Sequence, residues 1–167
     1  MIRALRICTT LVSVSSSLSA MKVHFEHEKI CHPGINFPLH KIYAYASPAG
    51  QDTQKQAKVE IGYVSFVQDY IIHLGVEKPY RKKGLGTQLC IRALSMIKRA
   101  GYQKAEWRAT NSIPFYLRMG AKLKQLPDPV LILGTVEYNA TMEFDFERDG
   151  DPRINAQKFK QHFIAYK

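Results

Sequence analysis

The chain of 167 residues has few cysteines, no long apolar run and no internal repeat. Its three cysteines, Cys8, Cys31 and Cys90, share no metal-ligand spacing, and nothing in their placement indicates a disulfide framework, so we expect a reducing compartment. Cys90 falls in an amphipathic segment and is expected to be a small buried apolar residue. No stretch reaches the roughly 18 apolar residues that a membrane-spanning helix needs, so we expect no membrane span.

Acidic residues are also scarce. The chain has 24 Lys and Arg residues against 14 Asp and Glu residues, a net charge of +10, and no acidic residue precedes Glu26. Such a surface favours anionic partners, which include a nucleotide cofactor, a nucleic acid and an acidic membrane face. No block of five like charges and no repeated pairing of arginine with aromatic residues indicates a nucleic-acid module. A solvated basic surface is the plainer interpretation.

The first 20 residues differ from the rest of the chain. Arg3 and Arg6 precede a short apolar run, and residues 13–19 are mostly serine. This pattern fits a signal peptide, an organelle presequence or an upstream extension, with Met21 opening the folded domain. We therefore divide the chain into residues 1–20, a domain over 21–148 and a tail over 149–167 with a short helix at 156–165. A cytoplasmic location is the default, and organelle targeting or export stays open.

Hydrophobic periodicity predicts an α+β domain. Strands are expected over 22–28, 42–46, 59–67, 70–76, 104–109, 121–125 and 136–146, and helices over 85–100 and 112–118. A polar hairpin loop is expected over 48–58. The region between the first two strands is short and contains Pro33, Gly34 and Pro38.

A basic turn with two glycines joins the fourth strand to the long helix. Its sequence is Arg81-Lys82-Lys83-Gly84-Leu85-Gly86. Glycines let backbone N–H groups close on a phosphate, and a helix N-terminus and nearby cations add positive potential. The turn therefore predicts an anion site, although an ordinary strand-to-helix turn with solvated lysines would have a similar sequence.

Two segments together resemble a known family. The order Leu74-Gly75-Val76, Pro79-Tyr80-Arg81 and Gly84-Leu85-Gly86 resembles the acetyl-CoA signature of the GNAT N-acetyltransferases. A second segment, Asn111 to Tyr116 followed by Met119-Gly120-Ala121, is similar to a later motif of that family. The resemblance covers about residues 60–146 and implies a mixed, mostly antiparallel sheet flanked by helices. The family usually has two helices between its first two strands, and this chain has no room for them.

The resemblance also implies roles for individual residues. Backbone groups of Leu74, Gly75 and Val76 would pair with the pantetheine arm of acetyl-CoA, and Asn111 would also contact the cofactor. Tyr116 would be the general acid, with packing beside Phe115 as the alternative role. The pyrophosphate would lie on the residues Arg81, Lys82, Lys83, Gly84, Leu85, Gly86 and Thr87.

The general base is less determined by the sequence. Glu106 on the fifth strand resembles the base of one subgroup, which acetylates ribosomal-protein N-termini. Asp69, Glu60 and His73 are alternatives, and a water relay without a single base is another. The four histidines His24, His27, His32 and His40 lack a Glu or Cys set of metal-like spacing, so we predict no metal site.

The resemblance thus implies an acetyl-CoA-dependent N-acetyltransferase that transfers the acetyl group directly to a primary amine within a ternary complex. The acceptor would be a small molecule or a protein, and the protein would be a monomer or a homodimer. Two alternatives stay open. One is a non-catalytic CoA-binding regulatory module, and the other is a basic domain that binds nucleic acid or an anionic surface.

Overall fold

The computed structural model describes residues 21–31, 33–34, 36–48, 58–110, 112–132 and 135–155. The chain forms two compact units, one from the residues up to Val67 with His73–Ala93 and one from Gln68–Ile72 with the residues from Leu94 onward. Several predicted features lie outside the described residues. These are the segment 1–20, most of the loop 48–58, Asn111 and the tail helix at 156–165.

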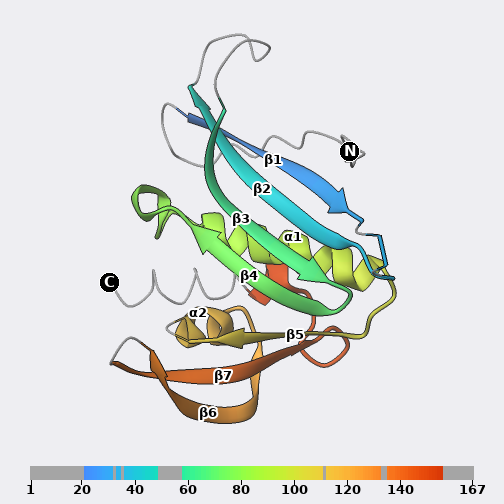
Figure 1. Cartoon of the computed structure of the whole chain (residues 1–167), viewed down its shortest axis with the longest axis vertical. Helices are drawn as coiled ribbons and strands as arrows, with labels where there is room; N and C mark the ends of the chain where they lie inside the picture. The colour runs from blue at the N-terminus through green and yellow to red at the C-terminus, as the bar shows by residue number, and fades with distance from the viewer. Residues whose placement is uncertain are drawn as a thin grey trace. The chain divides into compact units, whose positions relative to one another are not determined.

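The first unit is a sheet with one long helix on it (Figure 1). It contains β1 (Met21–Ile30), β2 (Leu39–Pro48), β3 (Val59–Val67), the second part of β4 (Tyr70–Val76), the short 3-10 helix η1 (Lys78–Tyr80) and the first part of α1 (Leu85–Arg99). β1 pairs with β2 and β2 with β3, both antiparallel. The described residues between β1 and β2 contain no helix, so the predicted short connection is confirmed.

α1 covers one face of this sheet because its apolar side chains lie along one side of the helix. Leu89, Cys90 and Ala93 are fully buried. The cross-strand pairs of the register place Phe25, Ala44 and Gly62 on the same sheet face. A side-chain atom of Leu89 comes within 3.4 Å of the position a Cβ on Gly62 would take. Burial of Cys90 raises the pKa of its thiol to about 12, which confirms its predicted role as a buried apolar residue.

The second unit contains the first part of β4, the last part of α1, β5 (Lys104–Ala109), α2 (Ile113–Arg118), β6 (Lys122–Ile132) and β7 (Thr135–Asp145). β5 is parallel to β4 and antiparallel to β7, and β6 is antiparallel to β7. Because β4 belongs to both units, the strand order is β1-β2-β3-β4-β5-β7-β6. This mixed, mostly antiparallel sheet confirms the predicted α+β class.

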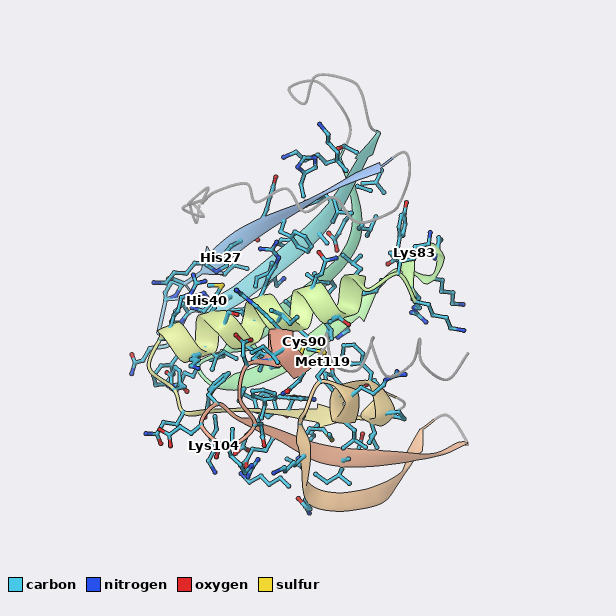
Figure 2. All side chains as sticks on the ribbon, turned by 180° about the vertical axis from the view of Figure 1, so that it is seen from behind. His27, His40, Lys83, Cys90, Lys104 and Met119 are labelled. Atoms are coloured by element: carbon cyan, nitrogen blue, oxygen red, sulfur yellow. The ribbon has the colours of Figure 1, made fainter. Side chains whose placement is uncertain are left out.

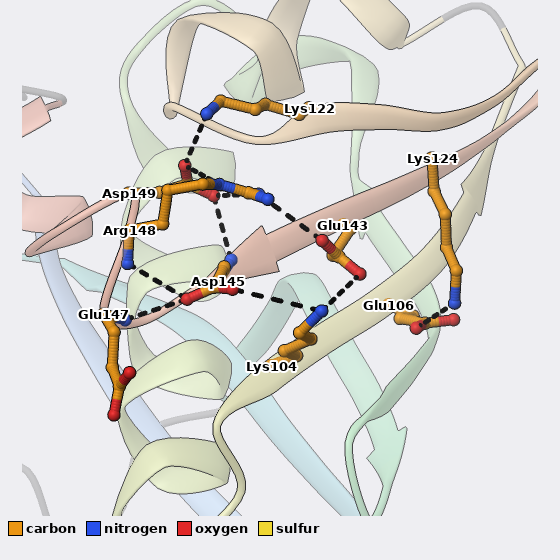
Figure 3. A network of polar contacts seen from close by, with 9 residues as sticks. All are labelled: Lys104, Glu106, Lys122, Lys124, Glu143, Asp145, Glu147, Arg148 and Asp149. Atoms are coloured by element: carbon orange, nitrogen blue, oxygen red, sulfur yellow. Dashed lines mark hydrogen bonds and ion pairs between the residues drawn. The ribbon is translucent and has the colours of Figure 1, made fainter.

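A network of charged side chains fixes the turn that follows β7 (Figure 3). Asp149 accepts hydrogen bonds at Oδ2 from Arg148 Nη2 at 2.8 Å and from the backbone N–H of Asp145 at 2.9 Å. Lys122 Nζ lies 3.3 Å from the other oxygen of Asp149, and Arg148 Nη2 lies 3.4 Å from Glu143 Oε1. The start of the predicted tail is thus held against the second unit by several partners.

The predicted bounds of the strands and helices agree best with those of the structure in the middle of the chain. The strands predicted over 59–67, 70–76 and 104–109 have those bounds in the structure. The predicted strands 22–28, 42–46 and 121–125 are too short, since β1, β2 and β6 all extend further. The predicted helices differ by one residue at an end, and η1 was not predicted.

Candidate functional site

The predicted anion loop joins β4 to α1 in the first unit. The backbone N–H of Glu77 donates to the carbonyl of Ile61 at 3.0 Å, which fixes the point where the chain leaves the sheet. Arg81 Nε then donates to the carbonyl of Val76 at 2.8 Å. This bond ties the loop to the end of β4, so one residue of the motif sets the geometry between the strand and the loop.

The loop has the backbone conformation that an anion cradle needs. Lys82 has a φ of 61° and Gly84 a φ of 81°, both in the left-handed region. A Cβ on Gly84 would meet nothing within 4 Å, so the glycine is needed for its backbone angle and not for space. Turns with such angles can point successive N–H groups to one side, where they bind anions.

The N-terminus of α1 adds free donors and positive potential. The first helical bond runs from the N–H of Gln88 to the carbonyl of Gly84 at 3.1 Å, so the N–H groups of the residues between them have no acceptor within the helix. The first turn of α1 contains no acidic residue. Lys83, labelled at this end of the helix in Figure 2, is exposed, as are Arg81 and Lys82. The arrangement suits a phosphate.

The strand before the loop lies close to β3, since a Cβ on Gly62 would lie 2.7 Å from the carbonyl oxygen of Gly75. The residues Leu74, Gly75 and Val76 are partly buried. The registered pairing of β4 with β5 covers only Tyr70 and Ile71, near the start of β4. A strand without a neighbour on one side keeps N–H and carbonyl groups for a ligand that lies along it.

Tyr116 lies on α2 in the second unit and is buried, with 5% of its surface exposed. Its ring lies 4.9 Å from the ring of Trp107 and 4.9 Å from that of Phe115, measured between centroids. Two aromatic neighbours hold the tyrosine in one orientation. The packing role that the sequence left open is therefore present, and an acid role would be additional to it.

Glu106 lies on β5, and its carboxylate forms an ion pair with Lys124 (Figure 3). Successive strand residues point to opposite faces, and the neighbouring Trp107 is the residue that packs on Tyr116. Glu106 and Tyr116 therefore lie on opposite faces of β5, and the structure does not bring the two predicted catalytic side chains together.

His73 lies two residues before Gly75 in the first unit. It is exposed, and its ring is stacked on that of Tyr63 at 4.8 Å between centroids. His73 Nε2 lies 2.7 Å from the position that a Cβ on Gly75 would take, so the imidazole is directly beside the backbone of the predicted pantetheine strand.

Sequence reasoning missed a pair of histidines on β1 and β2. His27 and His40 are labelled side by side in Figure 2. His27 Nε2 lies 3.0 Å from His40 Nδ1, and the ring of His40 is stacked on that of Phe66. Burial is the main cause that lowers the pKa of both histidines, and the Lys29 ammonium adds to it. Only the strand register, which the sequence does not contain, could have shown this pair. Among the described residues, no three His, Cys, Asp or Glu side chains gather as a metal site would require.

No helix in the described part of the chain has both the length and the apolar character to cross a membrane.

Comparisons with known proteins give one matching family and several similar structures. Residues 51–120 match the acetyltransferase (GNAT) domain family. A proposed acetyltransferase from Acinetobacter baylyi ADP1 is similar in structure, with a TM-score of 0.51, 16% identity and coverage of 66% of this chain and 64% of that one.

Two further structures are similar. A GCN5-related N-acetyltransferase from Rhodopseudomonas palustris has a TM-score of 0.49, 23% identity and coverage of 63% of this chain and 61% of that one. A proposed streptothricin acetyltransferase from Bacillus anthracis, in complex with acetyl coenzyme A, has a TM-score of 0.48, 18% identity and coverage of 68% and 65%. The chain thus spans less than two thirds of the length of these relatives. The match over residues 51–120 thus shows similarity to the acetyltransferase (GNAT) domain family.

Proposed function

We propose that this acetyltransferase transfers the acetyl group of acetyl-CoA directly to a primary amine of a small molecule or a protein, within a ternary complex. The observation that carries the proposal is the loop between β4 and α1. It combines two left-handed residues, free N–H groups at the start of a 15-residue helix and three exposed cations. Together these features suit the binding of a pyrophosphate, and an ordinary turn between a strand and a helix does not require them.

The hydrogen bond from Arg81 to Val76 also fixes the position of the loop relative to the strand. The pyrophosphate and the pantetheine arm are parts of one ligand, so the residues that bind them must keep a fixed separation. Arg81 Nε, held 2.8 Å from the Val76 carbonyl, links the end of the strand to the loop. We assign the pyrophosphate to the residues 81–87 and the pantetheine arm to the backbone of Leu74, Gly75 and Val76.

The reaction requires one nucleophilic attack and two proton movements. The neutral amine attacks the thioester carbonyl carbon, a C–N bond forms, and the C–S bond breaks with its electrons on sulfur. The thiolate takes a proton from an acid, which we propose is Tyr116, because a tyrosine holds its proton at neutral pH and can donate it to a thiolate. The amine loses a proton to a base.

Of the candidates for this base, Glu106 and His73 each have support from a different observation. The resemblance supports Glu106, whose carboxylate is paired with Lys124. The geometry of the first unit supports His73, whose imidazole lies beside Gly75 and is exposed. A histidine can accept a proton near neutral pH. Glu106→Gln and His73→Gln variants separate them, because loss of the base lowers kcat and removes the acidic limb of the pH–rate profile.

Calorimetric titration of acetyl-CoA into the full chain tests the cofactor site. We expect Arg81→Glu and Gly84→Glu to weaken binding by at least about ten-fold, since each puts a negative charge where the phosphates lie. Lys22→Glu, a charge reversal of an exposed β1 residue, is the matched control and should bind as the wild type does. A folded wild-type protein without affinity for acetyl-CoA would refute the proposal.

Tyr116→Phe tests the acid role separately from packing. The phenylalanine keeps the ring contacts with Trp107 and Phe115 and removes only the hydroxyl group. If Tyr116 is the acid, kcat falls by roughly 100-fold while the Kd of acetyl-CoA stays the same. An unchanged kcat would assign the residue to packing alone. Mass spectrometry of amine mixtures after reaction identifies the acceptor.

A further inference from the structure

A row of aromatic rings crosses three strands of the first unit. The ring centroids of Tyr45 and Tyr43 are 6.0 Å apart, those of Tyr43 and Tyr63 are 6.1 Å apart, and those of Tyr63 and His73 are 4.8 Å apart. We call these four residues the tyrosine ladder. It runs from β2 through β3 to β4 and ends beside Gly75, at the strand assigned to the pantetheine arm.

The ladder lies on the sheet face opposite to α1. In the register, Tyr43 pairs with Tyr63, whereas the neighbouring pair of Ala44 and Gly62 faces α1. The three tyrosines are half-buried and His73 is exposed. In the described part of the first unit, the one long helix is α1, so no described helix of that unit covers the ladder.

Carboxylates border the ladder, although the chain as a whole is basic. Glu28 accepts a hydrogen bond from the Tyr43 hydroxyl at 3.2 Å, and Glu60 pairs with Tyr45 in the register. Neither carboxylate forms an ion pair with any described residue. Lys41 pairs with Glu28 in the strand register, but the two side chains form no ion pair in the described structure. Burial raises the pKa of Tyr43 to about 12, and the charge and hydrogen bond of Glu28 add to this rise.

One ammonium group of the chain already uses this surface. Lys58 Nζ forms an ion pair with Glu26 and lies 6.0 Å from the centroid of the Tyr45 ring. Ammonium groups are attracted both to ring faces and to carboxylates. The corner formed by Glu26 and Tyr45 thus accommodates an alkylammonium group.

We propose that the tyrosine ladder binds an acceptor that is a linear alkyl amine with a second ammonium group. The second ammonium would lie on the rings near Glu28 and Glu60, the methylene chain would lie along the rings, and the reacting amine would reach the His73 end. There the neutral amine forms the new C–N bond, the C–S bond of acetyl-CoA breaks, and one amine proton leaves to the base. The inference rests on the proposed function, because it places the ladder beside the acetyl donor.

Direct binding tests the ladder without requiring turnover. The full chain is titrated with 1,5-diaminopentane and with pentylamine, which has the same length and one ammonium group fewer, and tyrosine signals are followed by NMR. We expect the diamine to bind at least about five-fold more tightly. Equal affinity for the two probes, or no binding of either, would overturn the proposal.

Variants locate the site. Glu28→Gln should weaken diamine binding by about three- to ten-fold, whereas Glu147→Gln, which removes a carboxylate from the second unit, should not change it. Tyr63→Leu should weaken diamine binding, and Tyr63→Phe, which keeps the ring face, should restore it. A Tyr63→Phe variant that binds as poorly as Tyr63→Leu would contradict a role for the ring.

Titration with acetyl-CoA separates this inference from the proposed function. If acetyl-CoA binds but the diamine does not discriminate, the ladder proposal alone fails. If acetyl-CoA does not bind and the diamine does, the donor assignment fails while the ladder remains a cation site. Lys58→Ala gives a further check, since removal of the competing ammonium should tighten diamine binding, and weaker binding would oppose the proposal.

Discussion

Among the described glycines of the first unit, Gly62 on β3 should be the most sensitive to substitution by alanine. A Cβ at this position would lie 2.7 Å from the carbonyl oxygen of Gly75, 3.3 Å from the Cα of Val76 and 3.4 Å from a side-chain carbon of Leu89. Real contacts of this kind lie beyond 3.0 Å, so the strand carrying Gly75 must move by at least 0.3 Å. Two of the three atoms are backbone, and no rotamer change can move them aside.

The expected cost follows from overpacking. Inserting a methyl group into a packed site costs about 1–3 kcal/mol of unfolding free energy, and the loss of glycine's freedom in the unfolded chain returns about 0.4–1 kcal/mol. A net loss of roughly 1–2 kcal/mol lowers Tm by about 2–8 °C in a chain of this length. Because the displaced atoms belong to the proposed pantetheine strand, the affinity for acetyl-CoA should fall as well.

Gly75→Ala is the matched comparison for stability. Its Cβ would also meet an atom at 2.7 Å, but that atom is Nε2 at the far end of the His73 side chain, which can rotate away. Urea unfolding of the two variants should therefore show a clear loss for Gly62→Ala and a small change for Gly75→Ala. Equal losses in the two variants, or a Gly62→Ala protein as stable as the wild type, would refute the reasoning.

Three further predictions concern titratable side chains. Burial lowers the pKa of His40 below 6.5 in the folded protein, so the unfolded chain binds more protons at acidic pH. The free energy of unfolding should therefore fall as the pH drops from about 6.5 toward the pKa of His40 in the folded protein. His40→Phe, which can keep the stacking on Phe66, should make the free energy of unfolding less dependent on pH in urea unfolding between about pH 7.5 and 5.5. Hydrogen bonds, first from Arg148, lower the pKa of Asp149 from 3.8 to about 2, so its stabilisation is complete above 3.8 and lost as pH falls toward 2. Asp149→Asn should cost no more than about 2 kcal/mol at pH 7 and little at pH 2, and a thermal unfolding series with a constant difference across pH would contradict this. Cys90, fully buried and with a pKa of about 12, should resist alkylation in the native protein while the exposed Cys31 reacts, as peptide mass spectrometry would show; rapid labelling of Cys90 would mean that α1 opens readily.

The central elements could be predicted from the sequence because their signals are local. Apolar residues define β3 and a continuous apolar run defines β4, and the pair Gln68 and Asp69 separates them. Gln68 adopts a φ of 52°, a turn conformation that polar residues tolerate better than branched ones. The signal for the loop between β4 and α1 is equally local, because its glycines, its cations and the helix that follows are consecutive in the chain.

The predicted lengths of the outer strands were too short, because pairing with a neighbouring strand extends them and this pairing is not a local property of the sequence. β6 continues to Ile132 through Pro129, although proline usually interrupts a strand. β6 is the last strand of the sheet and pairs only with β7, so an edge position can accept a residue that lacks an N–H group. β1 is the other outer strand, and its pairing with β2 also continues beyond the predicted residues.

The site was only partly predictable for the same reason. Alternation along β5 shows that Glu106 and Trp107 face opposite sides, but the sequence does not say which side α2 packs on. The contact between Trp107 and Tyr116 decides this, and it separates the predicted acid from the predicted base. Likewise, the tyrosine ladder depends on a register between β2 and β3 that shifts at Ala44 and Tyr45.

The net charge agrees with an anionic cofactor, whereas the proposed diamine acceptor depends on local charges that the net charge does not describe. A charge of +10 suggests an anionic partner and argues against a cationic acceptor. Salt screens charges over about 8–10 Å, so a bound group responds mainly to its immediate neighbours. Around the loop between β4 and α1, these neighbours are Arg81, Lys82 and Lys83. Around the tyrosine ladder they include Glu28 and Glu60, which form no ion pair with any described residue. A transferase that joins an anionic donor to a cationic acceptor needs this local separation of charge, and the overall charge reflects only the more abundant sign.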